Sequence, residues 1–193
     1  MFIGHLAPAL AASAIVRRPR LGPLVLAALL PDIAMWILVL AGIEHVGLSP
    51  TLSSVSPLDL WDVRWSHSLV GTLGWAAAFA VAVKLLTRDA RAAWLGAAVV
   101  ASHWLLDLVV HIPDLTVAGV GRRYGWGLWE QPYLAMPLEL LLAFTAFTLY
   151  LDRTRATDWR GRWTPVLLAT VAVVLQLAQW LTRAPPEAIF RVP

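Results

Sequence analysis

Long apolar runs, separated by short polar connections, make up most of the chain. Apolar residues fill six segments, at about residues 1–16, 22–43, 67–86, 92–112, 134–151 and 164–182. A helix needs about 20 such residues to cross the hydrocarbon core of a bilayer, so the first segment is short and the others are long enough. The pattern predicts an all-α integral membrane protein, a bundle of about six transmembrane helices with the first one short. We expect residues 1–193 to form a single transmembrane helical domain.

The composition agrees with this pattern. The 193 residues are 59% hydrophobic and 14% charged, whereas soluble domains carry about 25% charged residues. The chain has no cysteine, which excludes disulfide bonds. Its net charge of +3 is expected to reflect cytoplasmic connections. We therefore expect membrane lipids as partners and no nucleic-acid partner.

The charges of the connections predict how the helices are oriented. Connections 17–21, 84–91 and 152–163 are net positive, whereas 44–66 is net negative and 113–133 is neutral. Short basic connections stay in the cytoplasm, so the net-positive connections should share the cytoplasmic side. This alternation predicts a multi-pass protein with both termini outside.

Ionisable residues recur inside the apolar segments. In "SHWLLDLVVH", His103, Asp107 and His111 follow one another at intervals of four, which places them on one face of a helix. An aspartate at the centre of a membrane helix costs about 2.5–3.5 kcal/mol, so such residues normally face the bundle interior and pair. The topology places this face in the outer half of the bilayer. Other segments are expected to bring ionisable residues to the same zone, namely His5, Asp32, His67 and Glu139.

This convergence favours a metal site. Two imidazoles and a carboxylate within reach of one point form a good ligand set for zinc or a similar divalent ion. Ser66 and Ser102 each precede a histidine, and each either packs and caps a helix or hydrogen-bonds to a ligand. Glu44 and His45 either line the mouth of the site or lie at the membrane interface.

Four short motifs, in order over residues 4–107, resemble a known family. They are Gly4-His5, Leu30-Pro31-Asp32, Ser66-His67-Ser68-Leu69, and Ser102-His103 followed by Asp107. The motifs are similar to those of the inner-membrane metal-dependent hydrolase family, the LexA-binding, inner-membrane-associated hydrolases. The resemblance implies a metal-dependent hydrolase in the bacterial inner membrane. The order of ligands is also similar to that of zinc-dependent phospholipase C, which implies a multi-zinc site bridged by the aspartate at position 107.

The chain departs from the family pattern at two places. Ala34 stands where the family has the second aspartate of Leu-Pro-Asp-x-Asp, and Asp62-Val63-Arg64 stands where it has His-Arg-Gly. Asp62 is one residue that can replace the lost ligand.

The first functional hypothesis is a membrane-embedded metal-dependent hydrolase that acts on a lipid or another phosphoester. The metal site would lie in the extracytoplasmic half of the bilayer and hold a divalent metal, zinc first, with manganese or iron as alternatives. Glu139 or Asp62 is expected to act as the general base. The expected metal ligands are His5, Asp32, His67, His103, Asp107 and His111.

Three alternatives stay open at this point. A proton- or ion-coupled transporter also uses intramembrane Asp and His residues. Haem held by two histidines explains the paired imidazoles but not Asp32 and Asp107. A non-catalytic scaffold or adaptor with a degenerate metal site is favoured by Ala34 and by the missing His-Arg-Gly motif.

Overall fold

The computed structural model describes residues 2–16, 20–49, 52–181 and 190–191. Arg17 and Arg18 of the first basic connection lie outside this part, as do the charges of residues 182–189. The described chain is mostly helical and confirms the predicted fold class: six α-helices, of which five are long and apolar and the first is short. It is a multi-pass membrane protein.

The six helices follow the apolar segments closely. Their bounds are α1 Leu6–Ile15, α2 Leu21–Leu40, α3 Leu69–Thr87, α4 Ala90–Val110, α5 Pro132–Arg153 and α6 Trp159–Leu181. Where the bounds differ from those predicted, local chemistry explains the difference. Helix α2 ends before the apolar run does, because Gly42 adopts a positive φ of 68° that breaks the helix. Helix α6 begins earlier than predicted, at Trp159, because it includes a polar first turn that precedes the apolar run.

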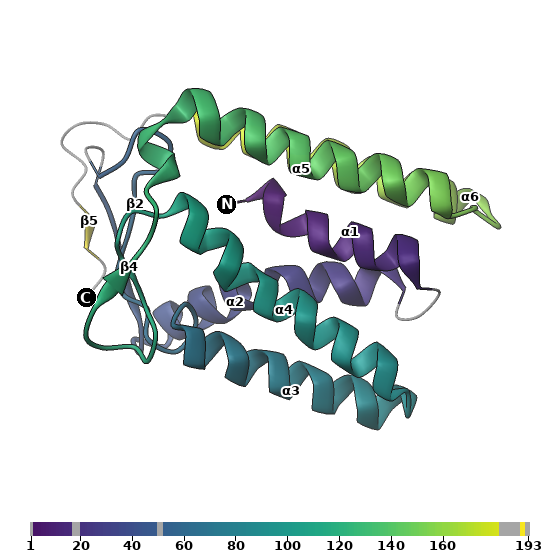
Figure 1. The fold of residues 1–193 in the computed structure, drawn as a ribbon, viewed down its shortest axis with the longest axis horizontal. Coiled ribbons are helices and arrows are strands. Elements are labelled where there is room, and N and C mark those ends of the chain that lie inside the picture. The colour runs from purple at the N-terminus through teal and green to yellow at the C-terminus, as the bar shows by residue number, and fades with distance from the viewer. Residues whose placement is uncertain (1, 17–19, 50–51, 182–189, 192–193) are drawn as a thin grey trace.

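The first helix is too short to cross a bilayer. A short 3₁₀ turn, η1 (Ile3–His5), leads into α1, and at about 1.5 Å per residue the helical stretch from Ile3 to Ile15 is roughly 20 Å long. The hydrocarbon core is about 30 Å thick. The helix therefore starts inside the bundle, between α4 and α5 (Figure 1).

Two buried polar side chains hold the start of the chain at this depth. The Phe2 amide donates to Oε2 of Glu139 on α5 (3.2 Å), and the Ile3 amide donates to Oε1 of Gln176 on α6 (3.1 Å). The first amides of a helix have no partner within it, and no bulk water reaches them in a bilayer. Glu139 and Gln176 satisfy these donors and so fix where the following His5 lies.

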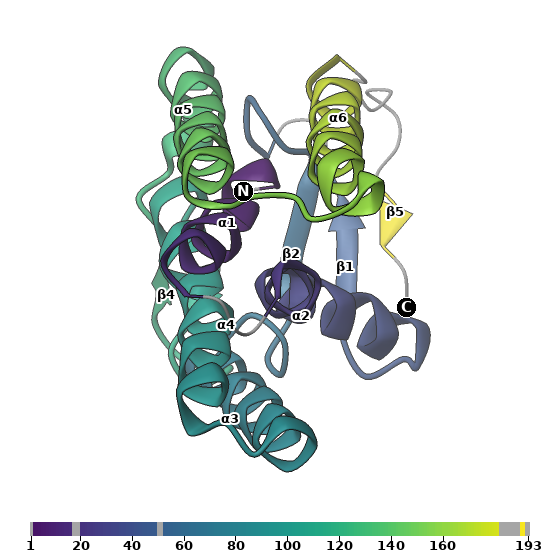
Figure 2. The ribbon, with the colours of Figure 1, turned by 90° about the vertical axis from the view of Figure 1, so that its right-hand side faces the viewer.

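Small residues let the remaining helices pack closely. The core between α1, α2, α3 and α4 is rich in alanine, including Ala9, Ala27 and Ala97, as is common where membrane helices approach one another. At the α3–α4 contact, Gly96 faces the ring of Phe79 at a distance that leaves no room for a Cβ atom. Seen along the helices in Figure 2, α2 lies beside α4. The second half of α2 packs on the strands that follow it, through Met35 and Val39 against Val46 and Leu60.

Small sheets cap one end of the bundle. Strands β1 (His45–Leu48) and β2 (Leu58–Asp62) pair antiparallel, and β5 (Phe190–Arg191) adds to β1, giving the order β2-β1-β5. A second hairpin joins β3 (Leu115–Thr116) to β4 (Arg123–Tyr124). The pattern of apolar residues does not predict these strands. The basic connections 84–91 and 152–163 both lie at the opposite end (Figure 1).

We expect Gly96→Ala to lower the apparent melting temperature of the detergent-solubilised protein. The added Cβ would overlap the buried Phe79 ring, and overpacking of this kind costs about 1–3 kcal/mol. Gly74→Ala on α3 is the matched control, because its Cβ meets no atom within 4 Å. Equal melting temperatures for the two variants would contradict close packing at Gly96.

Candidate metal centre

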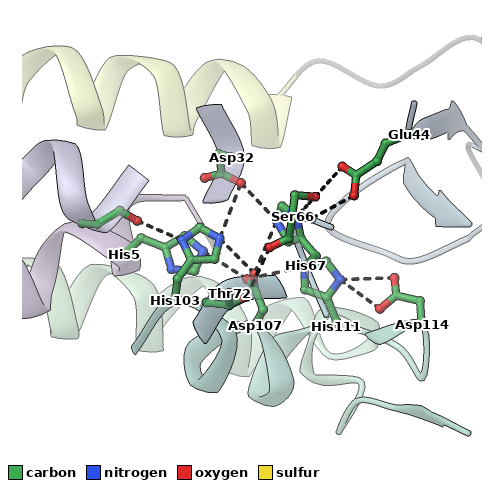
Figure 3. A network of polar contacts seen from close by, with 11 residues as sticks. His5, Asp32, Glu44, Ser66, His67, Thr72, His103, Asp107, His111 and Asp114 are labelled. Atoms are coloured by element: carbon green, nitrogen blue, oxygen red, sulfur yellow. Dashed lines mark hydrogen bonds and ion pairs between the residues drawn. The ribbon is translucent and has the colours of Figure 1, made fainter. Parts of the chain in front are cut away.

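The structure brings five of the predicted ligands together. His5 comes from η1, Asp32 from α2, His67 from the turn before α3, and His103 and Asp107 from α4 (Figure 3). Four of them are almost fully buried, whereas the Asp32 side chain is 34% exposed. The centre is therefore closed on most sides and open at Asp32.

Two imidazole nitrogens and two carboxylate oxygens in this cluster approach one another closely. Asp32 Oδ1 lies 3.4 Å from His67 Nε2 and 3.5 Å from His103 Nε2. Asp107 Oδ2 lies 3.2 Å from His103 Nε2 and 3.9 Å from His67 Nε2. Zinc–ligand bonds of about 2.0–2.1 Å in tetrahedral geometry separate the ligand atoms by roughly 3.3 Å. Three of the four separations above are close to this value, so the cluster could hold a metal ion.

Asp107 presents its two oxygens to different pairs of imidazoles. Oδ2 faces His67 and His103, as described, while Oδ1 lies 3.0 Å from Nε2 of His5 and 3.5 Å from Nε2 of His111. The donor atoms of His5, His103 and Asp107 lie within 4.8 Å of one another, as do those of Asp32, His67 and His103. His103 therefore belongs to two overlapping groups, and Asp107 lies between them.

A chain of hydrogen bonds fixes the orientation of His67. The Ser66 hydroxyl donates to Oε2 of Glu44 (2.6 Å), so its oxygen can accept from Nδ1–H of His67 at 2.9 Å. Glu44 is held in turn, since its Oε1 accepts from the Trp65 and Ser66 amides. The proton of neutral His67 is thus on Nδ1, and the lone pair on Nε2 points toward Asp32 and Asp107.

Two further imidazoles are oriented in the same way. Nδ1 of His103 lies 2.9 Å from the carbonyl oxygen of Ala28, which only accepts hydrogen bonds. Nδ1 of His111 lies 3.1 Å from a carboxylate oxygen of Asp114. Each neutral ring therefore carries its proton on Nδ1 and turns its Nε2 lone pair toward Asp107. A partner on the outer nitrogen that orients the inner one is typical of metal-binding histidines.

The inward nitrogen of His103 lacks a hydrogen-bond partner in the centre. It is buried and has no hydrogen-bond partner among the described residues, although two carboxylates face it. A lone pair facing two carboxylates is repulsive unless a cation, either a metal ion or a proton, lies between them. A metal ion would satisfy all of these acceptors at once.

His5 and His111 occupy the edge of the centre. The His5 ring stacks on that of His103, with centroids 3.7 Å apart, and its Nδ1 has no partner in the described part of the chain. The His111 ring packs against Trp129 at 4.2 Å. His111 is not in either ligand group, so the structure joins it to the cluster only through Asp107.

The two predicted general bases lie apart from the ligand groups. Oε2 of Glu139 accepts from the Phe2 amide and Oε1 from the Trp129 indole at 3.5 Å. Asp62 bonds to Arg64 (2.6 Å) and His45 (3.1 Å) and belongs to neither ligand group. Burial raises the pKa of the Asp62 carboxyl, but hydrogen bonds from Arg64 and His45 outweigh this effect and hold the pKa below its ordinary value. Asp62 is therefore a weak base.

The structure also decides between the readings left open for the two serines. Ser66 orients His67, as described, whereas the Ser102 hydroxyl donates to the Val99 carbonyl of its own helix (2.7 Å). Glu44 is only 1% exposed and accepts from Ser66, whereas its depth relative to the membrane interface stays a prediction. Sequence reasoning missed the part played by Asp114, whose spacing of three residues from His111 was the available signal.

We expect the purified protein to contain a stoichiometric divalent metal ion, measured by inductively coupled plasma mass spectrometry. His103→Ala should abolish metal binding, and Ser66→Ala should weaken it by about 10–100-fold, the usual cost of losing an orienting partner. His45→Ala is the matched control, because this histidine contacts Asp62 outside the cluster. Metal-free wild-type protein, or equal metal in all variants, would contradict a metal site here.

Comparison with known proteins identifies no family for this chain. No family model, curated protein or solved structure matches it. What the structure supports by itself is a multi-span helical membrane protein with a buried His/Asp cluster that can hold a metal ion.

Proposed function

We propose that the protein is a membrane-embedded metal-dependent hydrolase that acts on a lipid or another phosphoester. The observation that carries the proposal is the orientation of the imidazoles. Outer partners hold His67, His103 and His111 so that each Nε2 points toward the carboxylate of Asp107. Such outer partners, which aim the inner nitrogens at one point, are typical of metal-binding histidines.

The proposed ligands are Asp32, His67, His103 and Asp107, with His5 and His111 as further donors beside Asp107. Zinc suits this mixture of imidazole and carboxylate, and manganese and iron are alternatives. A divalent ion supplies Lewis-acid polarisation of a phosphoryl or carbonyl oxygen and lowers the pKa of a coordinated water toward about 7.

The chain's own residues suggest where substrate enters and where a proton goes. Asp32 is the exposed member of the cluster, so substrate would reach the centre from its side. Oδ1 of Asp32 faces the imidazoles, while Oδ2 makes no hydrogen bond or ion pair within the described chain. Oδ2 is the proton acceptor that this geometry favours, ahead of Glu139, which holds the Phe2 amide.

The proposed location is the bacterial inner membrane, with the cluster in its extracytoplasmic half. The net-positive connections 84–91 and 152–163 share the end opposite the sheets, which is the arrangement that short basic loops on the cytoplasmic side require (Figure 1). The cluster lies toward the sheet end, because Glu44 and Asp114, which orient its histidines, belong to the connections at that end.

Single cysteines test this orientation, since the natural chain has none. We expect Val120→Cys, in the β3–β4 connection, to react with a membrane-impermeant maleimide in intact spheroplasts. Ala156→Cys, in the α5–α6 connection, should react only after the membrane is permeabilised. Both native side chains are exposed, so access alone does not separate them. The opposite labelling pattern would reverse the topology.

Hydrolysis itself is tested with metal-reconstituted protein and a chromogenic phosphodiester or a labelled phospholipid. We expect metal-dependent turnover by the wild type and by His45→Ala, and turnover at background level for His103→Ala and Asp107→Asn. Absence of turnover by wild-type protein that contains bound metal would contradict the proposed hydrolase activity.

That result would favour the second candidate, a non-catalytic scaffold or adaptor with a degenerate metal site. Two observations support this second candidate. Ala34 stands where the family motif has an aspartate, and Asp62 does not take over as a ligand because Arg64 and His45 engage it.

A further inference from the structure

A small polar pocket lies at the sheet end of the bundle, and the centre forms part of its wall. The pocket has a volume of about 240 Å³, and His67 of the His/Asp cluster lines it. Its other charged or titratable lining residues are Asp62, Arg64, Asp114 and Arg123. Pockets that enclose drug-sized ligands measure about 300–1,000 Å³, so this one suits a small polar group rather than a whole lipid.

The two carboxylates in the pocket already have cationic or donor partners. Asp62 is bound by Arg64 and by His45, at 2.6 and 3.1 Å. Asp114 is bound by Nδ1 of His111 at 3.1 Å. The Arg64 guanidinium offsets the charge of Asp62, and the imidazole of His111 engages an oxygen of Asp114.

The two arginines keep donors to spare. Arg64 uses Nε for Asp62, and its terminal nitrogens bond to no other described residue; its side chain is 56% exposed. Arg123 donates only to backbone carbonyls, those of Trp61 (3.0 Å) and Asp114 (3.3 Å), so no carboxylate neutralises its charge in the described structure.

The chain is built to bring the two arginines to one pocket. Arg64 follows β2, and Arg123 lies on β4 of the other hairpin. The β3–β4 connection passes so close to Arg64 that a Cβ at position 119 would come within 2.8 Å of the Arg64 Cβ. Gly119, with a φ of 80°, allows both this approach and the backbone turn.

We propose that Arg64 and Arg123 form an anion clamp that binds the phosphoryl group of the substrate beside His67. Guanidinium groups present paired donors that match phosphate oxygens, and two of them at a pocket that reaches the centre would hold a phosphoester next to it. This inference rests on the proposed hydrolase function and adds to it the residues that select an anionic phosphoester. Neutral carboxylic esters would gain nothing from this clamp.

The test measures binding rather than turnover. Purified protein in a maltoside detergent, which carries no phosphate, is titrated calorimetrically with inorganic phosphate and with a short-chain phosphatidylglycerol. We expect Arg64→Gln and Arg123→Gln each to weaken binding of the preferred probe by about tenfold or more, since a hydrogen bond to a charged group has this order of strength. Metal content, measured on the same samples, should stay unchanged.

Arg122→Gln is the matched control. Arg122 precedes Arg123 on the same hairpin but does not line the pocket, and its guanidinium lies over the Tyr124 ring at 5.4 Å. Arg123 also joins the two hairpins through its bond to the Trp61 carbonyl, so its loss could disturb the fold. Arg123→Lys is therefore a second variant, which keeps the positive charge but lacks the paired donors of the guanidinium group. We expect it to bind more weakly than wild type and more tightly than Arg123→Gln.

The two probes identify the source of the phosphoryl group. Tighter binding of phosphatidylglycerol than of inorganic phosphate would support a lipid headgroup, and equal or weaker binding would support a soluble phosphate compound. Equal affinities for wild type, Arg64→Gln and Arg123→Gln would overturn the clamp, even if metal and turnover are present. Arginine-dependent binding in a protein without turnover would keep the clamp and reject the hydrolase.

Discussion

The structure depends on a buried group of carboxylates and imidazoles inside a membrane-spanning bundle. A carboxylate in this setting is costly unless a cation lies beside it. Asp107 is 1% exposed and is surrounded by four imidazoles, which come from η1, from the turn before α3, and from α4 and its C-cap. The turn before α3 and the helices α2 and α4 are all fixed relative to one another by this group. Their packing elsewhere uses alanine and glycine, which bring the helices together but select no single arrangement of polar groups.

The short first helix follows from the same constraint. A helix that crossed the whole bilayer would place its first residues beyond the cluster. Because this helical stretch starts within the bundle, its first turn, which ends at His5, lies at the level of the cluster. Such a start leaves amide donors in an apolar environment, and Glu139 and Gln176 accept them. Glu139, which the sequence suggests as a catalytic base, thus anchors the segment before α1 in the structure. Its acceptors are engaged by Phe2 and Trp129.

Sequence periodicity was enough to find the helices, because a bilayer demands long apolar segments whatever they pack against. Depth along these helices was also enough to bring His5, Asp32, His67, His103 and Asp107 to one zone. It could not show that Glu44 reaches Ser66 from 22 positions away, because that contact depends on the turn after α2 and on the β1–β2 hairpin. Short strands such as β3 and β4 leave no periodic signal, so the pocket between Arg64 and Arg123 was also beyond prediction.

We propose that a metal ion, rather than a proton on His103, lies between the carboxylates of Asp32 and Asp107. A protonated His103 is the competing arrangement, because it would also donate to these carboxylates. Anomalous X-ray diffraction at the absorption edge of the bound metal separates the two directly. With a metal ion bound, we expect an anomalous peak about 2.0–2.2 Å from Nε2 of His67 and His103 and from carboxylate oxygens of Asp32 and Asp107. A cluster without a peak, in crystals grown with the metal, would contradict it.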